Sequence, residues 1–231
     1  MPEKYTYLLV DLCCIFFPFI CSFYRRINFY KQWKFFIFPC LSTALIFIIW
    51  DIIFTRAGVW SFNQEYICGI SYFGLPIEEY LFFICIPYAC VFTYHCVKIF
   101  LVLHSYQWAS RFSSAILIVG LLLVAAFHIP LLYTSVTFIA LAFFLALILL
   151  VRVSFLPTFF ISFLLIQLPF FISNGILTGS IIAAPVVFYN GNYNLGIRLF
   201  TIPFEDIFYG MLLFLMNVAG YEYLLNKTVR K

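Results

Sequence analysis

Charged side chains are scarce in this sequence of 231 residues. Thirteen are Lys or Arg and nine are Asp or Glu, which together make up 10% of the chain. Soluble globular domains carry about 25% charged residues, so this composition excludes an ordinary soluble domain. The net charge of +4 comes from cations that are spread over short connections. It therefore does not indicate a nucleic-acid partner, and we expect none.

Several motifs of enzyme chemistry are also missing. The chain has no Gly-x-Gly-x-x-Gly, no P-loop and no His-Glu-x-x-His, so dinucleotide, phosphate and zinc chemistry have no basis in the sequence. Its eight cysteines fall between Cys13 and Cys96 without Cys-x-x-Cys spacing, and we expect small apolar side chains rather than a metal site or a disulfide framework. The last apolar run has no central lysine, which argues against a retinal Schiff-base protein. We expect no metal and no cofactor.

Apolar residues dominate instead. They make up 65% of the sequence, and the mean hydropathy is +1.08. A bilayer core of about 30 Å needs roughly 20 apolar residues per helix. The sequence therefore predicts an all-α integral membrane protein with seven transmembrane helices, and we place it in a bacterial cytoplasmic membrane. The predicted spans are 5–23, 34–54, 77–100, 112–129, 131–151, 155–176 and 204–225.

The cations predict the orientation of these spans. Ten of them fall on one side of the membrane, and only Lys4, Arg56 and Arg198 fall on the other. By the positive-inside rule the side with ten cations is cytoplasmic, so the N-terminus lies outside. The ten are Arg25, Arg26, Lys31, Lys34, Lys98, Arg111, Arg152, Lys227, Arg230 and Lys231.

One acidic motif occurs twice. The stretch from Gly69 to Glu79, GISYFGLPIEE, returns 127 residues later as GIRLFTIPFED, from Gly196 to Asp206. Over 18 aligned positions seven residues are identical. The chain is therefore a duplication. These identities are Asn63/Asn190, Tyr66/Tyr193, Gly69/Gly196, Ile70/Ile197, Phe73/Phe200, Pro76/Pro203 and Glu78/Glu205.

The repeat predicts the organisation of the chain. Helices one, two and three correspond to helices five, six and seven, and helix four is a connector. Equivalent helices are four apart and run in the same direction, so this is a parallel 3+1+3 repeat. We expect a first unit at 1–103, a connector at 104–130 and a second unit at 131–231.

The two motifs concentrate four of the nine acids at predicted helix starts. After Pro76 and Pro203, such acids are stabilised by the helix dipole, which is one explanation for them. The second explanation is catalytic. Several acids in one apolar cavity do not all stay ionised, so a protonated carboxyl can lie beside a carboxylate and form an acid and base pair. The candidates are Glu78, Glu79, Glu205 and Asp206.

Other polar residues fall on the same outer side. Asp51 and Asn174 end the second and sixth spans, and we expect both to reach the cavity. The long outer connections carry Trp60, Asn63 and Asn190, and such mixtures of aromatics and amides suit segments that cover a cavity. An ordinary aromatic belt at the lipid headgroups explains the same residues. At the cytoplasmic end we expect Glu222 to pair with Lys227.

With these motifs the sequence resembles the membrane-integral lycopene cyclases, in the form that fuses the two subunits into one chain. The resemblance covers nearly the whole chain and is weakest at helix four. It is carried by Trp50-Asp51, Gly58-Val-Trp60, Phe62-Asn63, Leu75-Pro-Ile-Glu-Glu79, Asn174-Gly-Ile-Leu-Thr-Gly179, Tyr189-Asn190, Leu195-Gly-Ile-Arg198, Ile202-Pro-Phe-Glu-Asp206 and Tyr221-Glu222.

The resemblance implies conversion of the linear ψ ends of lycopene into β-ionone rings, through γ-carotene to β-carotene, without flavin and without net redox change. It implies that Glu78 and Glu205 act as acid and base, supported by or exchanging roles with Glu79 and Asp206. Asp51, Asn63, Asn174, Asn190 and Trp60 are expected around them. The expected partners are lycopene, membrane lipids, a second copy of the chain and other carotenoid-pathway enzymes. A carotenoid hydratase and a 3+1+3 transporter remain alternatives.

Overall fold

The computed structural model describes residues 3–229, so Arg230 and Lys231 of the charge count lie outside it. Within this range the chain forms seven helices that are long and apolar enough to cross a membrane, as the sequence predicts. The helices are α1 (Thr6–Cys21), α2 (Trp33–Arg56), α3 (Ile77–Phe100), α4 (Gln107–Phe127), α5 (Leu132–Val151), α6 (Leu156–Leu177) and α7 (Phe204–Val229).

The predicted spans match these helices, and the largest error lies at α4. This helix begins at Gln107 and not at 112, so it includes Ser110 and Arg111. A long basic side chain at the end of a span can bury its stem and hold its charged head near the interface, so Arg111 does not interrupt the helix. Short 3₁₀ helices precede α1, α2 and α4, namely η1 (Glu3–Tyr5), η2 (Phe29–Gln32) and η3 (His104–Tyr106).

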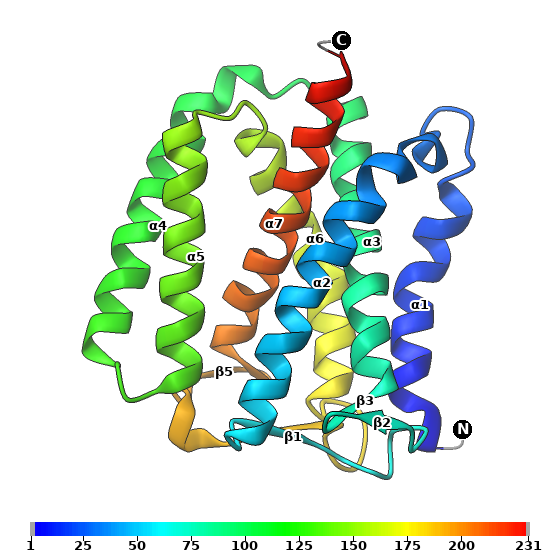
Figure 1. Ribbon diagram of the computed structural model, residues 1–231, viewed down its shortest axis with the longest axis vertical. Coiled ribbons are helices and arrows are strands. Elements are labelled where there is room, and N and C mark those ends of the chain that lie inside the picture. Colours follow the sequence, from blue (N-terminus) through cyan, green and yellow to red (C-terminus); the bar gives the residue numbers. More distant parts are fainter. Residues whose placement is uncertain (1–2, 230–231) are drawn as a thin grey trace.

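In Figure 1 the helices α2, α3, α6 and α7 lie in the middle of the bundle, with α1 on one side and α4 and α5 on the other. In the first unit α1 packs against α3, and in the second α5 packs against α7. The units meet where α2 contacts α7 and where α3 contacts α6, while the connector α4 packs mainly against α5. This arrangement agrees with the 3+1+3 repeat. It brings the starts of α3 and α7, which carry the acidic motifs, to the same end of the bundle.

Six very short strands lie in the outer connections, which the all-α prediction does not include. β2 and β3 form one hairpin before α3, and β5 and β6 form the equivalent hairpin before α7. β1 and β4 pair antiparallel and join the two connections, with Trp60 opposite Tyr189 and Phe62 opposite Val187. The strands are β1 (Trp60–Phe62), β2 (Ser71–Tyr72), β3 (Leu75–Pro76), β4 (Val187–Tyr189), β5 (Arg198–Leu199) and β6 (Ile202–Pro203).

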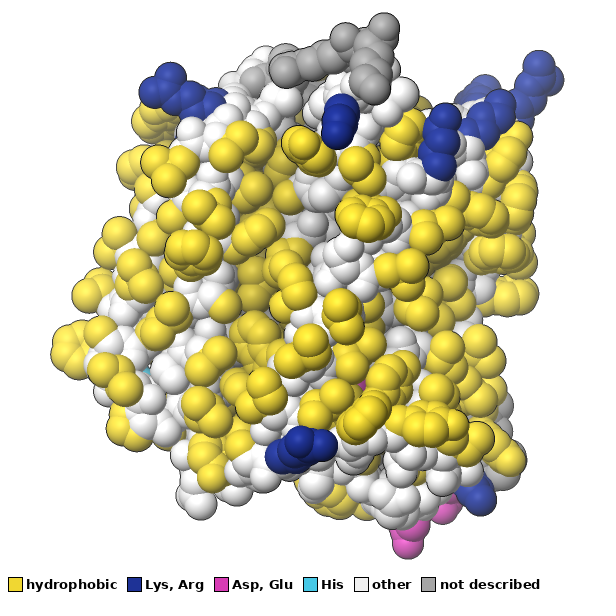
Figure 2. Space-filling model, viewed as in Figure 1, with side chains coloured by type: hydrophobic (Ala, Val, Ile, Leu, Met, Phe, Trp, Pro, Cys, Tyr) yellow, Lys and Arg dark blue, Asp and Glu magenta, His cyan; other side chains and the backbone are white. Residues whose placement is uncertain are grey.

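The surface has an apolar middle and polar ends. In Figure 2 hydrophobic side chains cover the sides of the bundle, and most of the visible Lys and Arg residues gather at the end opposite the N-terminus. A wide apolar belt between two polar rims is the surface expected of a protein that spans a bilayer. That the basic end faces the cytoplasm remains a prediction from charge.

Candidate active site

The two copies of the acidic motif fold in the same way. In each copy a two-stranded hairpin leads directly into a helix, and the first helical residue bonds back to the hairpin. The backbone N–H of Ile77 donates to the carbonyl of Ile70 at 2.9 Å, and that of Phe204 donates to the carbonyl of Ile197 at 3.0 Å. Both motifs therefore present their acids on the first turn of a helix, at the outer end of the bundle.

The first acid of each pair is bound to its own connection. Glu78 Oε1 accepts the backbone N–H of Cys68 at 2.7 Å, and Glu205 Oε1 accepts that of Leu195 at 2.7 Å. Glu205 Oε1 also accepts the Thr134 hydroxyl at 2.6 Å. Both side chains are fully buried, and their second oxygens have no partner among the described residues. The next acid of each pair, Glu79 or Asp206, belongs to the wall of an apolar cavity between the helices. Glu78 and Glu205 do not line this cavity.

Glu79 lies in that cavity together with Asp51 of α2. The Tyr7 hydroxyl donates to Glu79 Oε2 at 2.6 Å, and the Tyr209 hydroxyl donates to Asp51 Oδ1 at 2.6 Å. Asp51 and Glu79 are both buried, and both belong to the wall of this cavity. Burial and the proximity of a like charge both disfavour two ionised carboxyl groups, so the pair favours a state in which one of them holds a proton.

Asp206, the equivalent of Glu79, has a different environment. It accepts hydrogen bonds from Tyr133 at 2.6 Å, from Asn174 at 2.8 Å and from Tyr189 at 2.9 Å. Three donors stabilise an ionised carboxylate. Burial raises the pKa of Tyr189 well above its ordinary value, and the negative charge of Asp206 raises it further. Tyr189 therefore keeps its proton at neutral pH and acts as a donor.

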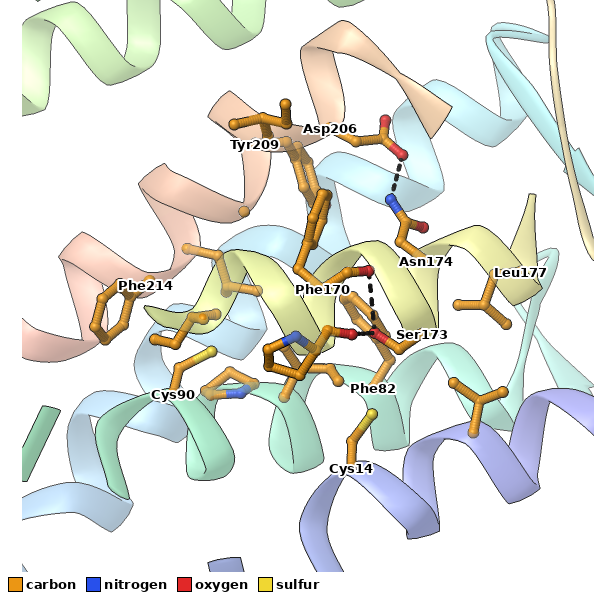
Figure 3. Close-up of a pocket in the computed structure, with 18 of the residues that line it drawn as sticks. Cys14, Phe82, Cys90, Phe170, Ser173, Asn174, Leu177, Asp206, Tyr209 and Phe214 are labelled. Carbon is orange, nitrogen blue, oxygen red and sulfur yellow. Dashed lines mark hydrogen bonds between the residues drawn. The ribbon is translucent and has the colours of Figure 1, made fainter. Parts of the chain in front are cut away.

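The cavity has a volume of about 170 Å³ and a mainly apolar wall. Figure 3 shows Asp206, Asn174 and Tyr209 toward one end, with Phe82, Phe170 and Cys90 around the rest. Its described wall includes Tyr7, Cys14, Asp51, Trp60, Phe62, Glu79, Phe82, Pro87, Cys90, Thr93, Tyr133, Phe163, Gln167, Pro169, Phe170, Ser173, Asn174, Leu177, Val187, Tyr189, Asp206, Tyr209, Leu213 and Phe214.

The outer connections cover the acidic end of this cavity. Trp60 and Phe62 of β1, together with Val187 and Tyr189 of β4, are part of its wall. Trp60 is 6% exposed and packs edge-on against Tyr133, with ring centroids 5.2 Å apart. These contacts support the prediction that the connections cover a cavity, rather than serving only as an aromatic belt.

Asn63 and Asn190 hold the two connections together and do not line the cavity. The Asn63 side-chain amide donates to the carbonyl of Pro185 at 3.3 Å, across to the second connection. The Asn190 side-chain amide donates to the carbonyl of Gly58 at 3.1 Å, across to the first. The repeated asparagines thus make reciprocal contacts, and they act on the cavity only through the backbone that covers it.

The structure thus brings together Glu79, Asp206, Asp51, Asn174 and Trp60 of the predicted set. Sequence reasoning missed the tyrosines that donate to the carboxyl groups. Tyr7, Tyr133 and Tyr209 lie near the outer ends of predicted spans, and Tyr189 lies in the second outer connection. A tyrosine at either kind of position is equally typical of a membrane interface. The missed residues are Tyr7, Tyr133, Tyr189 and Tyr209.

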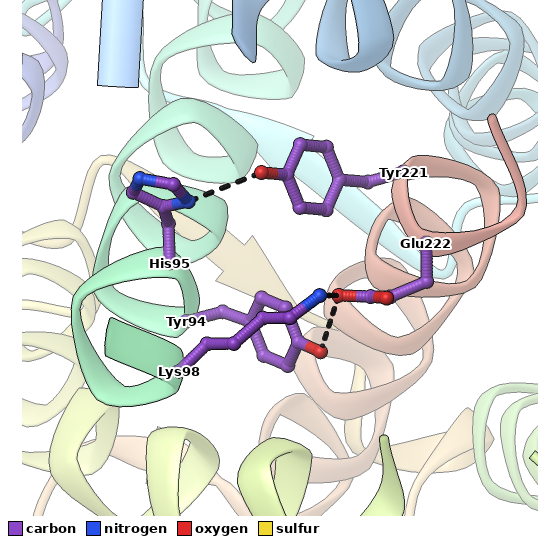
Figure 4. Close-up of polar contacts among 5 residues, drawn as sticks. All are labelled: Tyr94, His95, Lys98, Tyr221 and Glu222. Atoms are coloured by element: carbon purple, nitrogen blue, oxygen red, sulfur yellow. Dashed lines mark hydrogen bonds and ion pairs between the residues drawn. The ribbon is translucent and has the colours of Figure 1, made fainter. Parts of the chain in front are cut away.

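At the opposite end of the bundle, one predicted pair is wrong. Glu222 forms its ion pair with Lys98 of α3 and not with Lys227, and it also accepts the Tyr94 hydroxyl at 2.7 Å. Figure 4 shows these contacts beside the hydrogen bond between His95 and Tyr221. The close packing of α3 against α7 brings Lys98 near, which sequence distance cannot indicate. The cluster joins the two helices.

Fold and site together define an integral membrane protein in which two three-helix repeats enclose one acidic, aromatic cavity. The family model described as lycopene cyclase matches residues 4–97 and 130–224. The chain belongs to the lycopene cyclase family, which makes it an enzyme with lycopene cyclase activity in general terms. Searches of curated proteins and of solved structures returned no significant match.

Proposed function

We propose that this enzyme converts the linear ψ ends of lycopene into β-ionone rings, giving γ-carotene and then β-carotene without net redox change. The observation that carries the proposal is the meeting of Glu79, from the first repeat, and Asp206, from the second, in one apolar cavity. Cyclisation of an alkene needs an acid and a base on the same substrate end, and it needs an environment without competing water.

Glu79 is the proposed proton donor. It shares a buried cavity wall with Asp51, so the two carboxyl groups do not both stay ionised, and its place on that wall allows proton transfer to a terminal double bond of the substrate. The hydrogen of the acid forms a new C–H bond, and the electrons of its O–H bond remain on the carboxylate. The Tyr7 hydroxyl stabilises the negative charge that develops there.

Protonation of the terminal double bond gives a tertiary carbocation on the substrate. The next internal double bond attacks this cation, which closes a six-membered ring and moves the positive charge onto a ring carbon. Aromatic faces attract cations, and Phe82 and Phe170 lie on the wall of the cavity. An apolar aromatic wall stabilises such a cation without offering a nucleophile.

Asp206 is the proposed base. Three hydrogen-bond donors favour its carboxylate, which removes a proton from the ring and leaves a ring double bond. One proton is added and one is removed, so the product is an isomer of lycopene. Two carboxyl groups whose environments keep one protonated and the other ionised are typical of an acid and base pair in an active site.

This assignment moves the chemistry from the first acid of each pair to the second. The sequence favours Glu78 and Glu205 as acid and base, but their hydrogen bonds from the backbone N–H groups of Cys68 and Leu195 support a structural role for them instead. Lycopene reaches the site from the bilayer in this proposal. The proposal places the enzyme in a bacterial cytoplasmic membrane with its N-terminus outside. It also includes a second copy of the chain and carotenoid-pathway enzymes as partners.

The test is pigment analysis in a bacterial host that accumulates lycopene, with expression of the wild-type chain, Glu79→Gln or Asp206→Asn. We expect the wild type to give cyclic isomers of lycopene and each variant to leave lycopene unchanged. Detection of each variant in the membrane fraction excludes failed insertion. A wild-type product heavier by one water per end would identify a hydratase, and unchanged lycopene beside inserted wild type would refute the proposal.

A further inference from the structure

Because the chain is duplicated, one possible scheme is that each repeat closes one ring of the substrate. We propose instead that the chain has one cyclisation site for both ends, so that the monocyclic product leaves, reverses and binds again before the second ring closes. This inference rests on the proposed function. It starts from the composite wall of the cavity, to which Glu79 and Tyr7 contribute from the first repeat and Asp206 and Tyr133 from the second.

The two repeats have diverged around their equivalent acids. At the 127-residue offset Asp51 corresponds to Thr178, and its hydrogen-bond partner Tyr209 corresponds to Phe82. The second repeat therefore has no carboxyl group to share a proton with Asp206 at this position. The acid pair belongs to the first repeat alone.

The opposite divergence marks the base. Asn174 and Tyr189, which both donate to Asp206, correspond to Phe47 and Phe62 in the first repeat. Glu79 thus lacks the equivalents of these two donors. One repeat supplies an acid and the other a base, so neither can complete a cyclisation alone.

The size of the cavity agrees with one occupant. A cavity of about 150 Å³ in another protein binds benzene, so the volume of about 170 Å³ found here suits one six-membered ring. Along α6 the wall extends from Asn174, near the carboxyl groups, to Phe163, which is about 16 Å deeper at the helical rise per residue. One end of a polyene can reach the acids while the remainder extends away from them.

A second acidic cavity would be needed for a one-pass reaction. The outer cavity beside β1 and β4, of about 290 Å³, has Thr55, Ser61 and Asn190 on its described wall but no carboxyl group. Glu78 and Glu205 are buried and bound to their connections. Of these two cavities, only the one with Glu79 and Asp206 carries carboxyl groups on its described wall. In this scheme both ends use these two acids, and the proton taken up by Asp206 returns to Glu79 between the two closures.

The first test is a time course with purified protein in liposomes that contain lycopene in large molar excess. We expect monocyclic carotene to exceed the molar amount of protein several-fold before the bicyclic product appears. Labelled lycopene with added unlabelled monocyclic carotene should give bicyclic product with diluted label. Bicyclic product that forms without a lag and keeps its full label would overturn the inference.

The second test uses the single variants Glu79→Gln and Asp206→Asn in the same liposomes. A shared site predicts that each variant blocks both closures, whether lycopene or monocyclic carotene is supplied. Accumulation of monocyclic product from lycopene in either variant would indicate one site per repeat and overturn the inference. Absence of any cyclic product with the wild type would refute the proposed function itself, which is a different result from either of these.

Discussion

Glu78 and Glu205 lie 127 positions apart and make the same contact. Each accepts, at 2.7 Å, the backbone N–H of the residue ten positions before it, Cys68 in one repeat and Leu195 in the other. A hydrogen bond to a charged acceptor is worth about 1.5 to 3 kcal/mol. The two carboxylates therefore hold the connections against the starts of α3 and α7, and the next residue in each pair is left to face the cavity.

The first prediction concerns Glu78→Gln and Glu205→Gln. Glutamine keeps an oxygen that accepts the same backbone N–H, so we expect both variants to retain cyclisation within about tenfold. Loss of the charge should lower stability by about 1 kcal/mol. Product formation and thermal unfolding in detergent measure the two effects. Glu78→Gln with normal thermal stability and no product would contradict the assignment of Glu79 as the donor.

The second prediction concerns the donors to Asp206. Tyr133→Phe removes a 2.6 Å hydrogen bond to the carboxylate without changing the shape of the side chain. We expect the cyclisation rate to fall roughly 10- to 100-fold, the equivalent of about 1.5 to 3 kcal/mol. Tyr72→Phe is the control, because Tyr72 is exposed and lies outside the cavity wall. Equal rates for both variants would show that Tyr133 has no role at Asp206.

The third prediction concerns the reciprocal asparagines. Asn190→Ala removes the bond to the carbonyl of Gly58 and the acceptor for the backbone N–H of Asn192. We expect unfolding in detergent at lower temperature, from a loss of about 1 to 2 kcal/mol. Asn192→Ala is a matched control, since its exposed side chain has no hydrogen bond among the described residues. If Asn192→Ala were as unstable as Asn190→Ala, the hydrogen bond from Asn190 to the carbonyl of Gly58 would have no specific role in stability.

The fourth prediction concerns the contact between α7 and α2. A Cβ atom on Gly220 would lie 2.7 Å from Cβ of Pro39, which is closer than atoms can approach. Gly220→Ala should therefore destabilise the fold by about 1 to 3 kcal/mol. Gly120→Ala in α4 meets nothing within 4 Å, so there we expect unchanged or slightly higher stability. The thermal unfolding temperatures of the two variants test this prediction. Equal stability of Gly220→Ala and Gly120→Ala would contradict the close contact between α7 and α2.

Much of the fold could be predicted from local properties. Apolar runs of membrane length locate seven helices, because a bilayer demands such runs regardless of how the helices pack. The boundary of α4 is the exception, since Arg111 interrupts the apolar pattern without interrupting the helix. The pairing of Glu222 with Lys98 was not predictable, because it depends on the approach of α3 to α7.

The duplication, the seven spans and the two acids at the start of each equivalent helix can be recognised in the sequence alone. Which acid of each pair faces the cavity depends on the tertiary structure. Neighbouring residues on a helix point about 100° apart, so the rotation of α3 and α7 in the bundle turns Glu79 and Asp206 inward and leaves Glu78 and Glu205 to the connections. That rotation is set by packing against other helices, which no single segment of the sequence encodes.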